Sequence, residues 1–186
     1  TSGILATHVW GRPCAIEELI EVAARHRLKL LFDAAHAFGC SYRGRKIGNF
    51  GGAEVFSFHA TKFLNTFEGG AVVTNDDELA GKIRLMTNFG FAGYDQVIYL
   101  GINGKMSEPA AAMGLTGLEC LDEFVATNRR HYKRYQEGLA DVPGVRLIRY
   151  DEADQNNYQY IVLELDELET HICRDQISSL LLAQNV

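Results

Sequence analysis

The chain has 186 residues, of which 47% are apolar and 23% charged, an ordinary composition for a globular protein that can bury a sizeable core. Its formal net charge of −6 argues against broad binding to nucleic-acid phosphates, which requires a basic face. No apolar run approaches membrane-spanning length. The four cysteines form no Cys-x-x-Cys pair, so we expect reduced, mostly buried thiols and a cytoplasmic protein.

The first half of the chain alternates predicted strands and helices. Strands are predicted at residues 3–9, 28–32, 54–58 and 70–74, with a helix at 16–27 and a loop at 40–52. A second helix is predicted to start after an N-cap at Asn75, with Glu78 completing a capping box, and to run to about Asn88. This alternation favours an α/β fold with a mainly parallel sheet.

The second half is predicted to begin with a long connecting loop from Phe89 to Met106, a length that is often functional. Ser107 is a predicted N-cap, with Pro109 in the first turn of the helix that follows. Further elements are predicted as helices at 108–121, 122–140 and 173–184 and strands at 145–149 and 158–165. We therefore expect a large-domain part at 1–106 and part of a smaller α+β domain at 107–186.

Polar side chains follow two of the predicted strands. Asp33 and His36 come after the apolar run that ends at Phe32, and Ser57, His59 and Lys62 close the strand at 54–58. If these strands are neighbours, they deliver an acid, two imidazoles, a hydroxyl and an amine to one edge of the sheet, where α/β proteins place ligands. An amine beside a buried carboxylate suits Schiff-base chemistry with pyridoxal phosphate (PLP).

Each of these residues also has a purely structural interpretation. Asp33 could cap a strand or helix, Ser57 could cap a turn, and Lys62 could lie on the surface. His36 and His59 could be hydrogen-bonded core residues, and metal binding is disfavoured because no third ligand has a suitable spacing. No P-loop and no dinucleotide-binding glycine fingerprint is present.

Three segments together carry a family resemblance. The runs DAAH (33–36), FSFHATK (56–62) and EGGAVVTND (68–76) resemble, in order and spacing, the nucleotide-sugar aminotransferases, which are PLP enzymes of the aspartate aminotransferase fold. Residues 7–14 and 103–108 extend the resemblance, which covers nearly the whole chain. The resemblance implies transfer of an amino group from L-glutamate to a keto-sugar nucleotide. The sequence of residues 57–70 is most similar to that of members acting at C-4 of a 4-keto-6-deoxyhexose.

The resemblance also implies individual roles. Lys62 would carry the cofactor as a Schiff base and shuttle a proton as general acid and base, and Asp33 would pair with the pyridinium nitrogen. His36 would lie near the cofactor ring, Ser57 would bind the phosphate, and His59 would line the pocket nearby.

A further role follows for Asn103, which would reach the phosphate from the partner subunit of a dimer. Members of the family are much longer, so the chain is identified as an internal piece lacking their N-terminal part and C-terminal end. We expect a homo-oligomer that covers the missing contacts. The alternative is a truncated, non-catalytic oligomeric module derived from such an enzyme.

Overall fold

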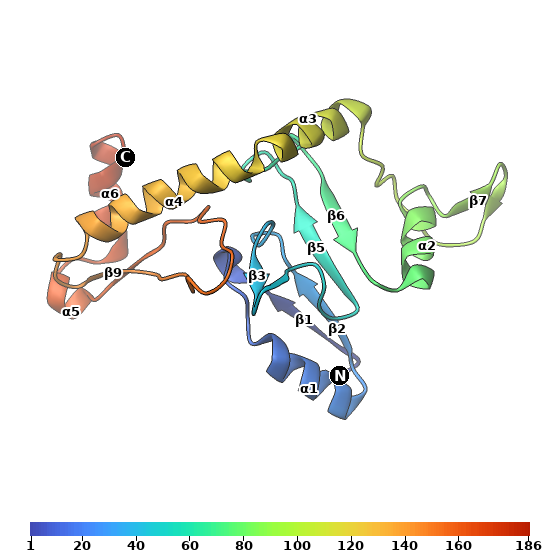
Figure 1. Ribbon diagram of the computed structural model, residues 1–186, viewed down its shortest axis with the longest axis horizontal. Helices are drawn as coiled ribbons and strands as arrows, with labels where there is room; N and C mark the ends of the chain where they lie inside the picture. Colours follow the sequence, from blue (N-terminus) through green and yellow to red (C-terminus); the bar gives the residue numbers. More distant parts are fainter.

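The computed structural model describes residues 1–186 and is built around a four-stranded sheet in the order β1–β2–β5–β6 (Figure 1). The strands are β1 (Gly3–Thr7), β2 (Lys29–Asp33), β5 (Ala53–Ser57) and β6 (Gly70–Val73). The first three are parallel, whereas β6 pairs antiparallel with β5. The predicted α/β class with a mainly parallel sheet is therefore confirmed.

The two faces of this sheet differ in how they are covered. Helix α1 (Ile16–His26) buries Ile16 against one face, together with Phe32 and Phe56. The opposite face presents apolar side chains from all four strands to solvent: Leu5, Leu31, Val55 and Val72, each more than 40% exposed. Parallel sheets normally carry helices on both faces, and this chain supplies a helix for one of them.

Residues 40–52, predicted as a loop, contain a hairpin. Strands β3 (Ser41–Tyr42) and β4 (Arg45–Lys46) pair antiparallel around a two-residue turn. Arg43 and Gly44 both have positive φ, 49° and 74°, as a type I′ turn requires. The loop prediction was wrong here because Arg-Gly is not one of the dipeptides that usually signal such a turn.

The capping box predicted at Asn75 was also wrong. Helix α2 (Asp77–Met86) is capped by Asp76, whose side chain accepts a hydrogen bond from Leu79 N at 3.0 Å. Glu78 instead pairs with Lys82 one turn later, at 2.5 Å. Asn and Asp are equally good caps, so the sequence could not decide between adjacent positions.

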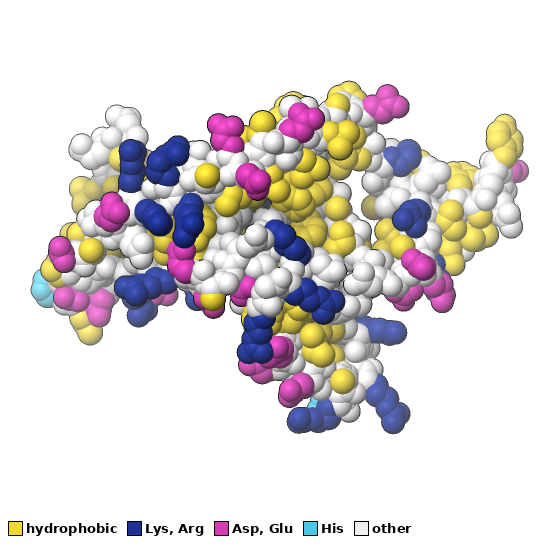
Figure 2. All heavy atoms as spheres, in the orientation of Figure 1, with side chains coloured by type: hydrophobic (Ala, Val, Ile, Leu, Met, Phe, Trp, Pro, Cys, Tyr) yellow, Lys and Arg dark blue, Asp and Glu magenta, His cyan; other side chains and the backbone are white.

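The predicted loop at 89–106 contains a second hairpin, formed by β7 (Phe91–Gly93) and β8 (Gln96–Val97). Figure 1 shows it projecting beyond α2, away from the central sheet. Its surroundings are strongly apolar, with Leu100 94% and Ile102 70% exposed. Figure 2 shows hydrophobic side chains gathered over this segment and over the region of α3.

Two helices in line make the long upper edge of the molecule (Figure 1). They are α3 (Glu108–Glu119) and α4 (Leu121–Gly138), separated only by Cys120. Ser107 caps α3 by accepting a hydrogen bond from Ala110 N at 3.4 Å, as predicted. None of the helices combines the length and apolar character that crossing a membrane requires.

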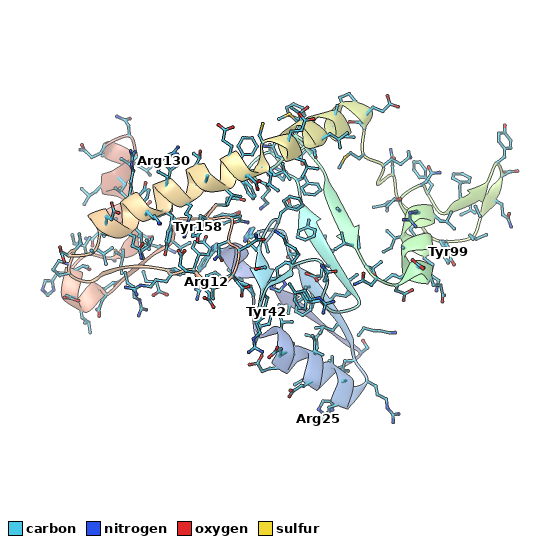
Figure 3. The ribbon with its side chains drawn as sticks, viewed as in Figure 1. Arg12, Arg25, Tyr42, Tyr99, Arg130 and Tyr158 are labelled. Atoms are coloured by element: carbon cyan, nitrogen blue, oxygen red, sulfur yellow. The ribbon has the colours of Figure 1, made fainter.

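The remaining elements are small. Strands β9 (Val145–Leu147) and β10 (Leu163–Leu165) pair antiparallel, followed by α5 (Glu167–Thr170) and α6 (Arg174–Ala183). The strand predicted at 158–165 is thus limited to its last three residues. Tyr158 packs with other aromatic residues in a second buried cluster, and Figure 3 shows it alongside α4.

The four cysteines are free, but only Cys40 is buried, so the prediction of mostly buried thiols was wrong. Burial raises the pKa of the Cys40 thiol to about 11, which keeps it protonated and unreactive at neutral pH.

Candidate active site

Two neighbouring strands carry the predicted site. β2 and β5 lie side by side and parallel, with Asp33 opposite Val55, so their carboxyl ends meet at one edge of the sheet. Asp33 is the last residue of β2 and Ser57 the last of β5. The expectation that these strands are neighbours is confirmed.

Asp33 is half-buried and keeps a free oxygen. Its Oδ1 accepts the one protein hydrogen bond of this carboxylate, from Ala35 N at 2.9 Å. This bond lies at the start of a turn that follows the strand directly. Oδ2 is left for a ligand.

His36 packs its ring against Tyr160 and accepts a hydrogen bond. Its Nδ1 accepts from Trp10 N at 3.1 Å, and its ring lies against that of Tyr160, with centroids 4.6 Å apart and tilted by 49°. Burial, followed by the positive charge of Lys62, lowers the pKa of His36 from its ordinary value, and Asp33 partly opposes this. Neutral His36 therefore carries its proton on Nε2, because Nδ1 accepts a bond.

Lys62 lies in the turn after β5, where its backbone N donates to His59 O at 2.9 Å. Its side chain is half-buried, and its amine makes one protein hydrogen bond, with the hydroxyl of Tyr160 at 3.3 Å. The charges of both Lys62 and Asp33 act on His36, so both groups lie within electrostatic reach of its imidazole. The amine has no carboxylate partner to neutralise it.

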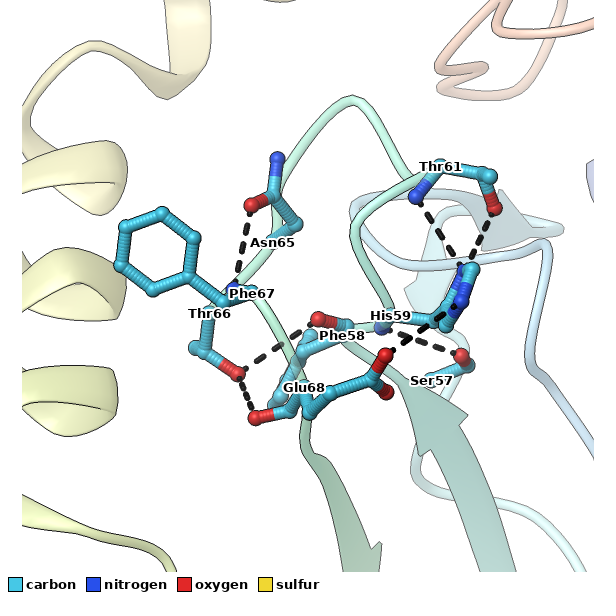
Figure 4. A network of polar contacts seen from close by, with 8 residues as sticks. All are labelled: Ser57, Phe58, His59, Thr61, Asn65, Thr66, Phe67 and Glu68. Carbon is cyan, nitrogen blue, oxygen red and sulfur yellow. Dashed lines mark hydrogen bonds and ion pairs between the residues drawn. The ribbon is translucent and has the colours of Figure 1, made fainter.

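Ser57 and His59 belong to a polar network within the same loop (Figure 4). Ser57 Oγ accepts from His59 N at 3.3 Å, and the His59 ring lies 2.9 Å from Thr61 Oγ1 and 3.5 Å from Glu68 Oε1. His59 is exposed, and these contacts direct it within its own loop. Ser57 therefore caps a turn, one of its two sequence interpretations, while its hydroxyl can still donate to a ligand.

Asn103 is not brought to these residues. It is exposed, forms an isolated bridge with Asn88, and accepts a hydrogen bond from Lys105 Nζ at 2.7 Å. Its segment leads out to the β7–β8 hairpin, which projects from the molecule (Figure 1). Within one chain, the site consists of Asp33, His36, Ser57 and Lys62.

Sequence reasoning missed the residues that come from the second half. Tyr160 contacts both His36 and Lys62, and Asn157 and Gln159 hydrogen bond to the loops that carry them. Gln159 and Tyr160 were missed because residues 158–165 were predicted to form a continuous strand. The polar run that precedes it, ending in Asn156 and Asn157, was the available signal.

A buried histidine–glutamate pair lies next to the turn that contacts His36. His8 and Glu54 are both fully buried, with Nε2 and Oε2 3.7 Å apart and neither atom hydrogen bonded. His8 Nδ1 accepts from Cys14 N at 3.2 Å, which closes the turn that contains Trp10. The pair thus helps to place the backbone amide that meets His36.

The side chains present fit PLP. A carboxylate with a free oxygen lies at a strand end, and a half-buried amine lacks any carboxylate partner. An imidazole whose pKa is lowered responds to the charges of both groups. A free amine is what an aldehyde requires for Schiff-base formation. A hydroxyl at the end of β5 adds a donor for a phosphate oxygen.

Comparison with known proteins supports the same assignment. A family model described as the DegT/DnrJ/EryC1/StrS aminotransferase family matches residues 1–186. A dTDP-4-amino-4,6-dideoxy-D-glucose transaminase of Shigella dysenteriae is 36% identical over 186 residues, covering 100% of this chain and 50% of that protein. A GDP-perosamine synthase of Caulobacter vibrioides is 39% identical over 142 residues, covering 75% of this chain and 38% of that protein.

Solved structures agree in fold. DesI, crystallised in the presence of its TDP-sugar product, superposes with a TM-score of 0.93 at 52% identity, covering 98% of this chain and 47% of DesI. PseC of Helicobacter pylori, an aminotransferase involved in the biosynthesis of pseudoaminic acid, gives 0.90 at 28% identity, with 99% and 50% covered. The chain spans about half the length of the curated relatives it matches most extensively.

Proposed function

Because this chain belongs to the DegT/DnrJ/EryC1/StrS aminotransferase family, we propose that it contributes the lysine-bearing half of a PLP-dependent aminotransferase. The reaction moves an amino group from L-glutamate to a keto-sugar nucleotide. The observation that carries the proposal is the half-buried amine of Lys62, which has no carboxylate partner and follows the strand adjacent to the one that ends at Asp33. Tyr160 contacts both this amine and His36.

The sugar is a 4-keto-6-deoxyhexose attached to a nucleotide. The support is twofold: the Shigella relative is named for a 4-amino-4,6-dideoxy sugar, and the match to it runs through all 186 residues of this chain. The perosamine synthase and the DesI product complex are named for nucleotide sugars as well.

Each side chain has a defined task. When bound, PLP supplies an electron sink that stabilises the carbanion formed at the substrate carbon. Lys62 Nζ would hold the cofactor through its aldehyde carbon and would serve as the acid and base that moves the substrate proton. Asp33 Oδ2 would keep the cofactor's ring nitrogen protonated, and Ser57 Oγ would donate to its phosphate. His36, neutral because burial lowers its pKa, would lie near the cofactor ring without competing with Asp33 as a charged group.

Oligomerisation completes the site. The exposed apolar side chains along the β7–β8 hairpin and on the open face of the sheet would be costly to leave in water. A second copy that covers them brings Asn103 to the phosphate of the neighbouring site, and His59 lines that pocket. Residues 1–106 and 107–186 then act as parts of a large and a small domain, and the free cysteines favour a cytoplasmic location.

Borohydride trapping after incubation with PLP, followed by peptide mass mapping, tests the proposal. We expect a reduced adduct on Lys62 that disappears in Lys62→Arg and persists in the exposed control Lys105→Arg. Addition of L-glutamate to the PLP-loaded protein should release 2-oxoglutarate. Adducts scattered over surface lysines, or none, would overturn the proposal and favour a non-catalytic oligomeric module.

A further inference from the structure

A four-residue segment from the second half of the chain, residues 157–160, connects the two loops of the site. Asn157 is fully buried, and its Nδ2 donates to His36 O at 2.8 Å and to Phe38 O at 3.0 Å, in the loop after β2. Two residues later, Gln159 Nε2 donates to Thr61 O at 3.3 Å, in the loop after β5. Its Oε1 accepts from Phe63 N at 3.4 Å.

These four bonds join loops that the sheet leaves independent. Asp33 ends β2, whereas Lys62 lies in the loop after β5, and no hydrogen bond joins these two loops directly. The segment therefore fixes the separation between the carboxylate side and the amine side of the site. It is itself anchored to α4, because Asn128 Nδ2 donates to Asn157 O at 3.1 Å.

The side chain of Tyr160 contacts a residue from each of the two loops. Its ring lies against His36, and its hydroxyl is 3.3 Å from Lys62 Nζ. Its backbone oxygen accepts from the hydroxyl of Tyr150 at 3.0 Å, so the residue is tied down at its main chain as well. No other protein hydrogen bond reaches the amine.

We propose that Tyr160, carried by Asn157 and Gln159, is a positioning residue that aims the Lys62 amine at the reacting carbon. The proposal rests on the function proposed above and deepens it. A lysine amine sits on a four-carbon stem whose freedom would otherwise spread it over many positions. A hydroxyl suits this task because it accepts from the charged amine and donates to the neutral one, so the contact survives a change of protonation.

A carboxylate in the place of the hydroxyl would act differently. It would hold the amine as an ion pair and compete with the cofactor carbonyl, whereas the hydroxyl restrains direction and leaves the amine available. The hydroxyl thus restrains the position of the Lys62 amine without neutralising its charge.

The test compares Tyr160→Phe, which keeps the ring against His36 and removes only the hydroxyl, with Tyr158→Phe as a matched control in the same segment. Lysines of the cofactor-free chain are acylated with limiting acetic anhydride, and the labelling of Lys62 is expressed relative to exposed Lys29 by peptide mass mapping. We expect the ratio to rise about threefold or more in Tyr160→Phe, because one hydrogen bond no longer restrains the amine. It should stay unchanged in Tyr158→Phe.

A second variant keeps the test decisive if Tyr160→Phe folds poorly. Gln159→Ala leaves Tyr160 in place but frees the loop of Lys62, and it should raise the same ratio. In the PLP-loaded protein, Tyr160→Phe should lower the maximal rate of the half-reaction with L-glutamate without changing the glutamate concentration for half-maximal rate.

The outcomes separate the two proposals. An unchanged labelling ratio in both Tyr160→Phe and Gln159→Ala overturns the positioning role, even if PLP is trapped on Lys62. Failure to trap PLP on Lys62 in the unaltered chain overturns the proposed function, while the labelling ratio still reports on the contact between Tyr160 and the amine.

Discussion

Removing the Asn157 side chain should destabilise the whole protein, because this residue is fully buried and joins two parts of the chain. Asn157→Ala loses the bonds to His36 O and Phe38 O and the bond that Oδ1 accepts from Gln159 N at 3.1 Å. Three bonds at about 1 kcal/mol each give a loss of about 3 kcal/mol in the free energy of unfolding. The partner groups left without bonds would add to this figure.

Urea unfolding followed by circular dichroism measures the loss. With a slope of about 2 kcal/mol per molar urea, the midpoint should fall by about 1.5 M. The melting temperature should fall by about 6–12 °C for a chain of this size. Asn49→Ala is the matched control, since this exposed residue donates one side-chain bond, to Lys46 O at 3.2 Å.

We expect the control to change the free energy of unfolding by less than about 0.5 kcal/mol. A loss below about 1 kcal/mol in Asn157→Ala would refute the reasoning, because it would mean that the two site loops keep their places without this side chain.

Two further predictions concern contacts across the same junction. Gly11→Ala should destabilise the protein and disturb His36, because Gly11 has a φ of 79° and an added Cβ would lie 2.8 Å from His36 O. A melting temperature equal to that of the unaltered chain would contradict this prediction. Burial would raise the pKa of Asp154, but bonds from the amides of Gly44 and Arg43 outweigh it and lower the pKa. Its contribution to stability is therefore present above the unfolded pKa, near 4, and is lost as pH falls through the lower folded value. The stability difference between the unaltered chain and Asp154→Asn should shrink between pH 5 and pH 2, and a difference independent of pH would exclude this linkage.

Local sequence determined the central sheet and the strand ends that carry the candidate site residues. The strands around Phe32 and Phe56 are short apolar runs bounded by polar residues, a pattern that depends on neighbours along the chain. Because the carboxyl ends of neighbouring parallel strands meet, Asp33, His36, Ser57 and Lys62 could be assigned to one edge before the fold was known.

Boundaries and short turns were less well determined. The cap of α2 at Asp76, and the hairpin turn at Arg43 and Gly44, depend on differences between adjacent residues that are worth little free energy. The hairpin is held instead by Asp154, which accepts from Arg43 N at 2.7 Å across more than a hundred residues. Such a partner leaves no local pattern.

Only the tertiary structure decided which residues complete the site. Gln159 and Tyr160 look like the start of a strand, and Asn157 looks like the end of a polar loop before it. All three instead hydrogen bond to two loops about one hundred residues earlier. Sequence periodicity records the faces of helices and strands, whereas a hydrogen bond between distant segments depends on how the whole chain folds back. The sequence therefore identified Lys62 as a candidate site residue, and only the fold showed the Tyr160 hydroxyl beside its amine.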